Sequence, residues 1–158
     1  MQSRLDYKNI APEALKPLLQ LEAYLNHSSG LEPSLLDLVR LRASQINGCA
    51  YCIDMHSKDL RARGETEQRL YELNAWRETP FYSDRERAAL EWTEAVTLVS
   101  QDHLPDEVFE RVRQYFSDPE LVSLTMAIVA INGWNRLAIS FRAIPGSYQP
   151  AVQARKTA

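Results

Sequence analysis

Apolar residues recur at helical spacing along almost the whole chain of 158 residues, and this periodicity constrains the fold more than any other feature. Glycines are few, and prolines stand at the edges of the apolar runs. No segment combines strand-like alternation with hairpin turn signals. The sequence therefore predicts an all-α protein of about eight helices, in a single domain that spans 1–158. A chain of this length is large enough to bury a substantial hydrophobic core.

Turn and capping residues mark the ends of the predicted helices. Capping boxes that pair Ser83 with Glu86 and Ser117 with Glu120 indicate two of the starts. Prolines that suit the first helical turn, and glycines that suit the end of a helix, indicate most of the others. The predicted helices cover residues 12–26, 33–47, 49–64, 66–76, 83–100, 105–116, 117–131 and a last segment after Asn132-Gly133.

The tripeptide "ING" occurs twice, at 46–48 and at 131–133. Each copy follows a long apolar helix and precedes a helix that ends near glycine, so we expect a helix break at both places. Internal duplication of a two-helix unit would produce this pattern, and chance agreement of three residues would produce it as well. If the unit is duplicated, only the first copy kept its cysteines.

The composition is that of an ordinary soluble protein. Apolar residues make up 45% and charged residues 25%, and the formal charge of −3 comes from interspersed acidic and basic residues. This balance indicates neither a nucleic-acid nor a membrane partner. The start "MQSRLDYKNI" lacks the apolar run of a signal peptide, and "LVSLTMAIVAI" is shorter than a bilayer span. We therefore expect a cytoplasmic protein, in which a purely structural disulfide is uncommon.

The only two cysteines lie three positions apart, and a histidine follows four positions after the second. Spacings of three and four place Cys49, Cys52 and His56 on one face of a helix that begins after Asn47-Gly48. Both sulfurs then lie in the first turn, where free backbone N–H groups and the helix dipole favour an anion. Because the thiolate is the reactive form of cysteine, this position favours reactivity.

A carboxylate is expected to join this face from the preceding helix. If the two helices fold back about Asn47-Gly48, Asp37 and His56 lie at nearly equal distances from the turn and can meet. A carboxylate on one imidazole nitrogen would raise the basicity of the ring, and the other nitrogen would take a thiol proton. Cys52, one turn before His56, is best placed to lose that proton, and Cys49 would then close the disulfide.

Four interpretations of this group compete. The cysteines can be small buried core residues, or they can bind zinc together with His56 and Asp37. A thioredoxin-type motif needs a strand before the helix, which this chain does not offer. The fourth interpretation, which the spacing favours, is a redox-active pair in an all-helical protein. No glycine-rich phosphate loop is present, and we expect neither a cofactor nor a metal.

The run "LVRLRASQINGCAYCIDMHSKDLRARGET" resembles the AhpD-like alkylhydroperoxidase branch of the carboxymuconolactone decarboxylase family. The resemblance is strongest over 33–64, and it extends through "INGWNRLAISFR" near the end of the chain. By position, Cys52 corresponds to the peroxidatic cysteine, Cys49 to its resolving partner and His56 to the histidine of the proton relay. Asp37 falls where the family commonly has glutamate, and Tyr51 falls where the alkylhydroperoxidase pattern has a second histidine.

The resemblance implies packed helix hairpins assembled as homotrimers or homohexamers. It also implies reduction of hydrogen peroxide or an organic hydroperoxide, with a dithiol reductant such as a lipoylated or thioredoxin-like protein. In this interpretation Asp37 and His56 prime the thiol, and the Tyr51 hydroxyl can hold a bridging water. Two alternatives remain open: a non-enzymatic redox-sensing oligomer, and an enzyme that uses His56 and Asp37 on a lactone or carbonyl substrate.

Overall fold

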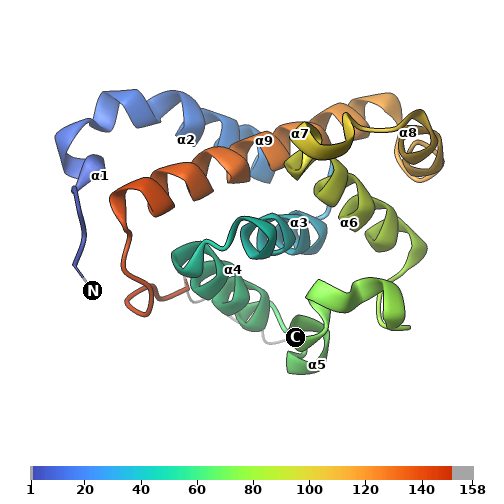
Figure 1. The fold of residues 1–158 in the computed structure, drawn as a ribbon, viewed down its shortest axis with the longest axis horizontal. Coiled ribbons are helices and arrows are strands. Elements are labelled where there is room, and N and C mark those ends of the chain that lie inside the picture. The colour runs from blue at the N-terminus through green and yellow to red at the C-terminus, as the bar shows by residue number, and fades with distance from the viewer. Residues whose placement is uncertain (1, 151–158) are drawn as a thin grey trace, which may run out of the picture.

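The computed structural model describes residues 2–150, and the described part of the chain contains ten helical elements and no strand (Figure 1). In chain order these are α1 (Tyr7–Ile10), α2 (Pro12–His27), α3 (Pro33–Asn47), α4 (Ala50–Ala62), α5 (Glu67–Tyr71), the 3-10 helix η1 (Leu73–Glu78), α6 (Asp84–Thr97), α7 (Val99–Asp102), α8 (Asp106–Val112) and α9 (Asp118–Phe141). The predicted all-α class is confirmed, with ten helical elements in place of about eight.

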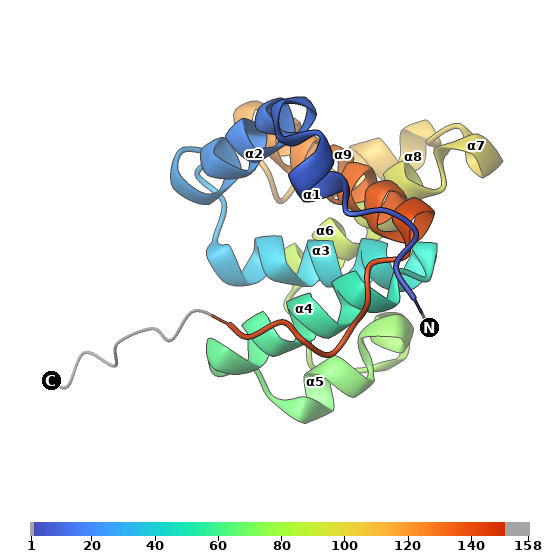
Figure 2. The same cartoon turned by 90° about the vertical axis from the view of Figure 1, so that its left-hand side faces the viewer.

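Helix α3 lies at the centre of the molecule and packs against α4, α6 and α9 (Figures 1 and 2). Nine of the ten positions of α3 from Leu35 to Ser44 are buried, and Arg42 is the exception. Helix α2 covers α9 on the other side of the molecule. The main core forms where α2, α3, α6 and α9 meet, and it includes Leu36, Val39, Trp92 and Ile128.

Most predicted helix boundaries are confirmed to within one or two residues. Both capping boxes are formed, with Ser83 and Glu86 at the start of α6 and Ser117 and Glu120 at the start of α9. The predicted helix at 66–76 divides into α5 and η1, because the backbone at Ala75 is not helical. The short helices α1 and α7 were not predicted, since four residues are too few to show a helical period.

The second predicted break, at Asn132-Gly133, is wrong. Helix α9 runs without interruption through both residues. The Asn132 side chain donates to the carbonyl of Ile128 one turn earlier and to the hydroxyl of Thr97 on α6. Gly133 faces Leu18 of α2, and a Cβ at this position would lie 3.5 Å from the Leu18 side chain, at ordinary contact distance. Packing against α2 and α6 therefore keeps the helix continuous, and no second hairpin repeats the α3–α4 unit at this position.

Helix α9 is longer and more apolar than any other helix described, and by length and composition it could cross a membrane. Nearly half of its most apolar window, 44%, is buried inside the protein. Its buried residues, such as Leu124 and Ile131, contact α2, α3 and α6 as those of a core helix do.

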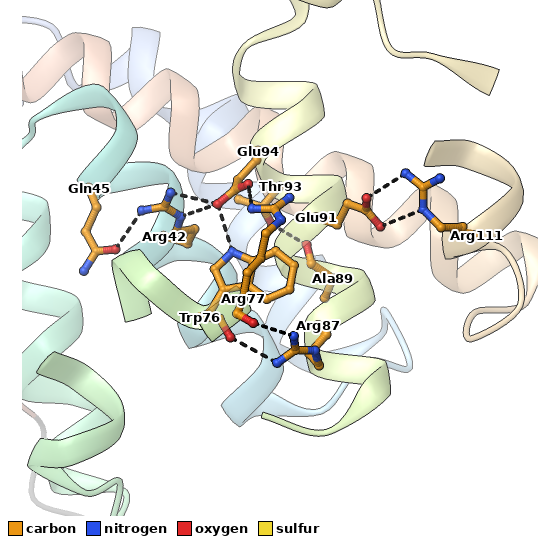
Figure 3. Close-up of polar contacts among 10 residues, drawn as sticks. All are labelled: Arg42, Gln45, Trp76, Arg77, Arg87, Ala89, Glu91, Thr93, Glu94 and Arg111. Atoms are coloured by element: carbon orange, nitrogen blue, oxygen red, sulfur yellow. Dashed lines mark hydrogen bonds and ion pairs between the residues drawn. The ribbon is translucent and has the colours of Figure 1, made fainter. Parts of the chain in front are cut away.

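A polar cluster around Glu94 joins α3, η1 and α6 (Figure 3). The Glu94 carboxylate accepts hydrogen bonds from the Arg42 side chain at 2.9 Å, from the Trp76 indole at 2.9 Å and from Arg77. Burial alone would raise the pKa of Glu94, but these three donors outweigh burial and lower it. The cluster fixes η1, the segment after α5, against α3 and α6.

Candidate functional site

The turn between α3 and α4 brings the two cysteines to the start of a helix. Gly48 ends α3 with a positive φ of 67°, and the N–H of Cys49 reaches back to the carbonyl of Ser44 at 3.0 Å. This is the hydrogen-bond pattern of a helix end that favours glycine. Cys49 then caps α4, and its sulfur accepts a hydrogen bond from the N–H of Cys52 at 3.4 Å. The predicted position of both sulfurs in the first helical turn is confirmed.

Cys49 and Cys52 form a disulfide in this structure. Their exposed fractions are 1% and 2%, and Ala138 of α9 completes the buried cluster around them. Tyr51 and Ala143 cover the cluster from outside. Neither sulfur is therefore open to bulk solvent, and any reagent must approach the pair through the interior of the protein.

A cavity of about 800 Å³ supplies such an approach to Cys52. Its walls come from α1, α2, α3, α4 and α9, and most of the wall surface is apolar. Its lining residues are Tyr7, Lys8, Pro12, Leu15, Leu19, Glu22, Asn26, His27, Pro33, Asp37, Arg40, Tyr51, Cys52, Met55, His56, Asp59, Arg63, Trp134 and Ala138. Cys52 lines this cavity and Cys49 does not, so the two cysteines differ in their access to it.

His56 lies one turn after Cys52, and its ring lines the same cavity. Neither ring nitrogen has a hydrogen-bond partner among the described residues. Burial and, to a smaller extent, the nearby Arg40 guanidinium lower the pKa of His56 to about 3. The ring is thus a neutral imidazole at physiological pH, with both nitrogens free to bond to a ligand or to a rearranged side chain.

Asp37 also lines the cavity, but it does not form the predicted hydrogen bond with His56. One carboxylate oxygen accepts from Arg40 Nη1 at 3.2 Å, and the other lies 2.7 Å from Arg63 Nε. Burial raises the pKa of Asp37, while the two arginines oppose that effect. The fold-back of α3 and α4 was predicted correctly, but two cations that the prediction did not consider occupy the carboxylate.

Arg40 is the main site residue that the sequence analysis missed. Its buried guanidinium joins α3 to α2, because it donates to Glu22 at 2.7 Å and to Asn26 at 3.0 Å as well as to Asp37. Trp134 of α9 fixes Glu22 through a further hydrogen bond of 3.1 Å. The spacing of three between Asp37 and Arg40 on one helix was a readable signal for their pairing. No sequence signal linked Glu22 to either residue.

Tyr51 lines the cavity at the position between the cysteines. The ammonium group of Lys8, on α1, lies 5.5 Å from the centre of the Tyr51 ring, within the range of a cation–π contact. Tyr51 therefore lies at the edge of the site beside an amino group. The zinc interpretation has no counterpart here, because no group of three or more potential ligands lies together among the described residues.

Comparison with known proteins agrees with this arrangement. The model of the carboxymuconolactone decarboxylase family matches residues 12–95, which include α2, α3 and α4. The uncharacterized protein YdfG of Bacillus subtilis is 46% identical over 140 residues, which make up 89% of this chain and 95% of YdfG. The chain belongs to the carboxymuconolactone decarboxylase family.

Solved structures place this family member in the AhpD-like branch. A protein of unknown function from Agrobacterium tumefaciens, proposed to be the antioxidant defence protein AhpD, is 46% identical with a TM-score of 0.88. The match covers 93% of this chain and all of that one. An uncharacterized peroxidase-related protein from Ralstonia eutropha, described as an alkylhydroperoxidase AhpD core, shares the fold at 19% identity and a TM-score of 0.77. That match covers 89% of this chain and 74% of the other.

Proposed function

We propose that this protein is a thiol-dependent hydroperoxide reductase in which Cys52 attacks the peroxide and Cys49 resolves the product. The observation that carries the proposal is the Cys49–Cys52 disulfide at the start of α4, with Cys52 but not Cys49 on the wall of the cavity that His56 also lines. The AhpD-like fold and the names given to related proteins agree with a peroxidase-related activity.

The chemistry needs two steps at the cysteines. In the first, the Cys52 thiolate attacks the terminal oxygen of the hydroperoxide, the O–O bond breaks, and the departing alkoxide takes a proton to become an alcohol. In the second, the Cys49 thiol condenses with the Cys52 sulfenic acid and releases water, which leaves the disulfide. His56 lies one turn after Cys52 and lines the same cavity, so it is the group we assign to accept the first thiol proton and to return one to the leaving oxygen.

Turnover requires a dithiol that supplies two electrons to the disulfide. The cavity reaches Cys52, so the reductant thiolate would attack the Cys52 sulfur, and Cys49 would be the leaving thiolate. A narrow dithiol arm carried on a protein suits this path better than a flat protein surface does. We further propose that the subunits assemble as a homotrimer or homohexamer.

Thiol titration of the reduced protein tests the proposal. One equivalent of cumene hydroperoxide should consume two thiols and yield the intramolecular disulfide. Cys52→Ser should abolish peroxide consumption, whereas Cys49→Ser should still consume one equivalent and stop at a sulfenic acid that dimedone traps. Undiminished peroxide consumption by Cys52→Ser would refute the assignment, and no reaction with any hydroperoxide would refute the function.

A redox sensor is the second candidate, and the environment of His56 favours it. An imidazole whose pKa is about 3 is a weak base for a thiol, so disulfide formation would be slow in the arrangement seen here. A sensor would form the disulfide over minutes and change its assembly. Light scattering with and without a reductant, together with the rate of peroxide consumption, distinguishes the two functions. A sensor should change the mass of its assembly on oxidation without rapid peroxide turnover. A reductase should turn over peroxide rapidly while the mass of its assembly stays constant.

A further inference from the structure

Three buried polar atoms in the cavity lack hydrogen bonds among the described residues. They are one carboxylate oxygen of Asp37, Oδ2, and the two ring nitrogens of His56. Buried polar groups nearly always have hydrogen bonds, and of these three atoms only Asp37 Oδ2 has an ion-pair partner, Arg63 Nε at 2.7 Å. The two side chains are chemically suited to each other, because the Asp37 carboxylate can accept a hydrogen bond from an N–H of the His56 ring. The acid and the base of the expected relay thus line one cavity but are not joined.

We propose that Arg63 is a positioning residue that controls the relay: it holds Asp37 away from His56 and completes the relay when it moves to Asp59. The effect of Arg63 on Cys52 chemistry rests on the proposed function. The change in pairing is a property of the fold and can be measured without any peroxide.

Two arginines hold Asp37, and only one of them is able to leave. Arg40 has a side chain that is 7% exposed, and it is fixed by Glu22 and Asn26 as well as by Asp37. Arg63 has a side chain that is 39% exposed, and Asp37 is its one ion-pair partner among the described residues. Its Nε lies 2.7 Å from Asp37 Oδ2, but the pair lacks the alignment of a hydrogen bond. Arg63 is therefore the more exposed of the two arginines, and its departure would break no other ion pair among the described residues.

Asp59 offers Arg63 a second partner. It lies one helical turn before Arg63, at the spacing that lets an acid and a base pair along a helix. Asp59 lines the same cavity, and one of its oxygens accepts a hydrogen bond from the Tyr148 hydroxyl at 2.7 Å. The other oxygen makes no hydrogen bond within the described residues, so it is open to a guanidinium. Arg63 can thus exchange one carboxylate for another without becoming unpaired.

The other charges around the cavity stay in place during this exchange. Arg40 and Glu22 remain paired with each other, and Lys8 remains at the edge over Tyr51. Titratable and charged groups line the cavity from each surrounding helix: Tyr7 and Lys8 on α1, Glu22 and His27 on α2, Asp37 and Arg40 on α3, and Tyr51, Cys52, His56, Asp59 and Arg63 on α4 or at its end. Tyr148, in the C-terminal segment, reaches this group by its hydrogen bond to Asp59. Movement of Arg63 would therefore free one oxygen of Asp37, Oδ2, while the other oxygen, Oδ1, keeps its contact with Arg40.

Completion of the relay changes the chemistry of His56. A freed Asp37 oxygen would accept one ring N–H, directly or through one water, and an adjacent carboxylate raises the basicity of an imidazole. The opposite nitrogen would then take the Cys52 proton to form the thiolate. With Arg63 on Asp37, as in this structure, His56 has no carboxylate partner and stays neutral, so in the reduced protein it would not take the Cys52 proton.

NMR titration of the His56 ring in Arg63→Met tests the proposal, with Arg61→Met as the matched control. Arg61 lies two residues earlier in the same helix, pairs with Glu67 and is 46% exposed, so its loss removes the same charge outside the cavity. We expect His56 to remain neutral from about pH 8 to about pH 4 in the wild type and in Arg61→Met. In Arg63→Met its titration midpoint should rise by about 2 pH units, as expected for a newly adjacent carboxylate. The His56 signal is identified by its loss in His56→Asn.

Further variants keep the proposal falsifiable. Arg63→Gln removes the same charge with a polar side chain and should give the same shift if Arg63→Met folds poorly. Addition of Asp37→Asn should cancel the shift, because no carboxylate is left to pair. An unchanged His56 titration in both Arg63 variants would overturn the proposal, as would a wild-type His56 that already titrates near 6.5. Peroxide consumption by the wild type is measured separately. Its absence would contradict the proposed reductase function but would leave the role of Arg63 to be decided by the His56 titration.

Discussion

The surroundings of His56 show how strongly one buried position departs from its behaviour in water. The ring is 7% exposed, lies near the cation of Arg40 and has no hydrogen-bond partner within the described residues. The charged form would lose its hydration with nothing to replace it, so the neutral form is favoured. The same neutrality that weakens His56 as a base makes it sensitive to any carboxylate that approaches.

This environment predicts that acid destabilises the protein through His56. The folded pKa of about 3 lies below the unfolded value of 6.5, so between these values the unfolded chain binds a proton that the folded chain does not. The stabilisation is complete above pH 6.5 and is lost as the pH falls toward 3, with a slope of about 1.4 kcal/mol per pH unit. Urea unfolding of the wild type and His56→Gln at several pH values measures the difference between their slopes.

An exposed histidine supplies the control for that experiment. His103 lies on the surface with a left-handed backbone, a conformation that asparagine tolerates. His103→Asn should therefore retain the slope of the wild type. Equal slopes for the wild type and His56→Gln would show that His56 is not buried in its neutral form.

At the scale of elements, the two "ING" tripeptides show that one local sequence can end a helix or continue it. Gly48 adopts a φ of 67° and ends α3, which aims the next residues into the start of α4. Gly133 lies within α9, where Leu18 of α2 packs over it. The side chains of the two asparagines meet directly, since Asn47 donates to Asn132 at 3.0 Å. The repeat therefore marks a contact between α3 and α9 and no second hairpin.

Alanine at each glycine should separate these two roles. Gly48→Ala places a Cβ in the left-handed region and should lower the free energy of unfolding by about 1–2 kcal/mol. A Cβ at Gly133 would lie 3.5 Å from the Leu18 side chain, which is ordinary contact. Gly133→Ala should therefore be neutral or stabilising by up to about 1 kcal/mol, because alanine favours the helix interior. Chemical denaturation of both variants checks the pair, and equal losses at the two positions would contradict a continuous α9.

At the scale of the whole molecule, a polar network holds the α3–α4 turn to α9. Asn135 is fully buried, accepts from Asn47 at 2.9 Å and donates to Ser44 at 3.1 Å. Ser44 in turn donates to the carbonyl of Arg40. The network runs from the turn before Cys49 to the residue that fixes Asp37, so the same contacts that hold the fold also position the site.

Removal of the central amide should therefore weaken the whole protein. Asn135→Ala deletes two buried hydrogen bonds and leaves a small cavity, at an expected cost of about 2–3 kcal/mol. For a domain of this size that cost lowers Tm by about 5–10 °C, which calorimetry can measure. Asn9→Ala is the matched control, since Asn9 is exposed and bonds to Asp6 alone. A loss below about 0.5 kcal/mol for Asn135→Ala would show that the network does not contribute.

Local interactions account for what the sequence determined without the structure. Helix ends depend on caps and on glycine or proline within a few residues, so α2, α3, α4, α6 and the start of α9 were predicted closely. The helical repeat also accounts for Cys52 and His56, which lie one turn apart on α4 and line the same cavity, with Cys49 as the N-cap of that helix.

Contacts between distant parts of the chain decided the rest. Arg63 at the end of α4 occupies one oxygen of the Asp37 carboxylate that was expected at His56, and packing by α2 and α6 keeps α9 continuous through Gly133. These features depend on which side chains come together in three dimensions, and on how much burial changes the strength of the interactions between their charges. The sequence alone determined the helices and the reactive face of α4. Only the tertiary structure decided which charges surround it, because those charges come from helices that meet only after the chain has folded.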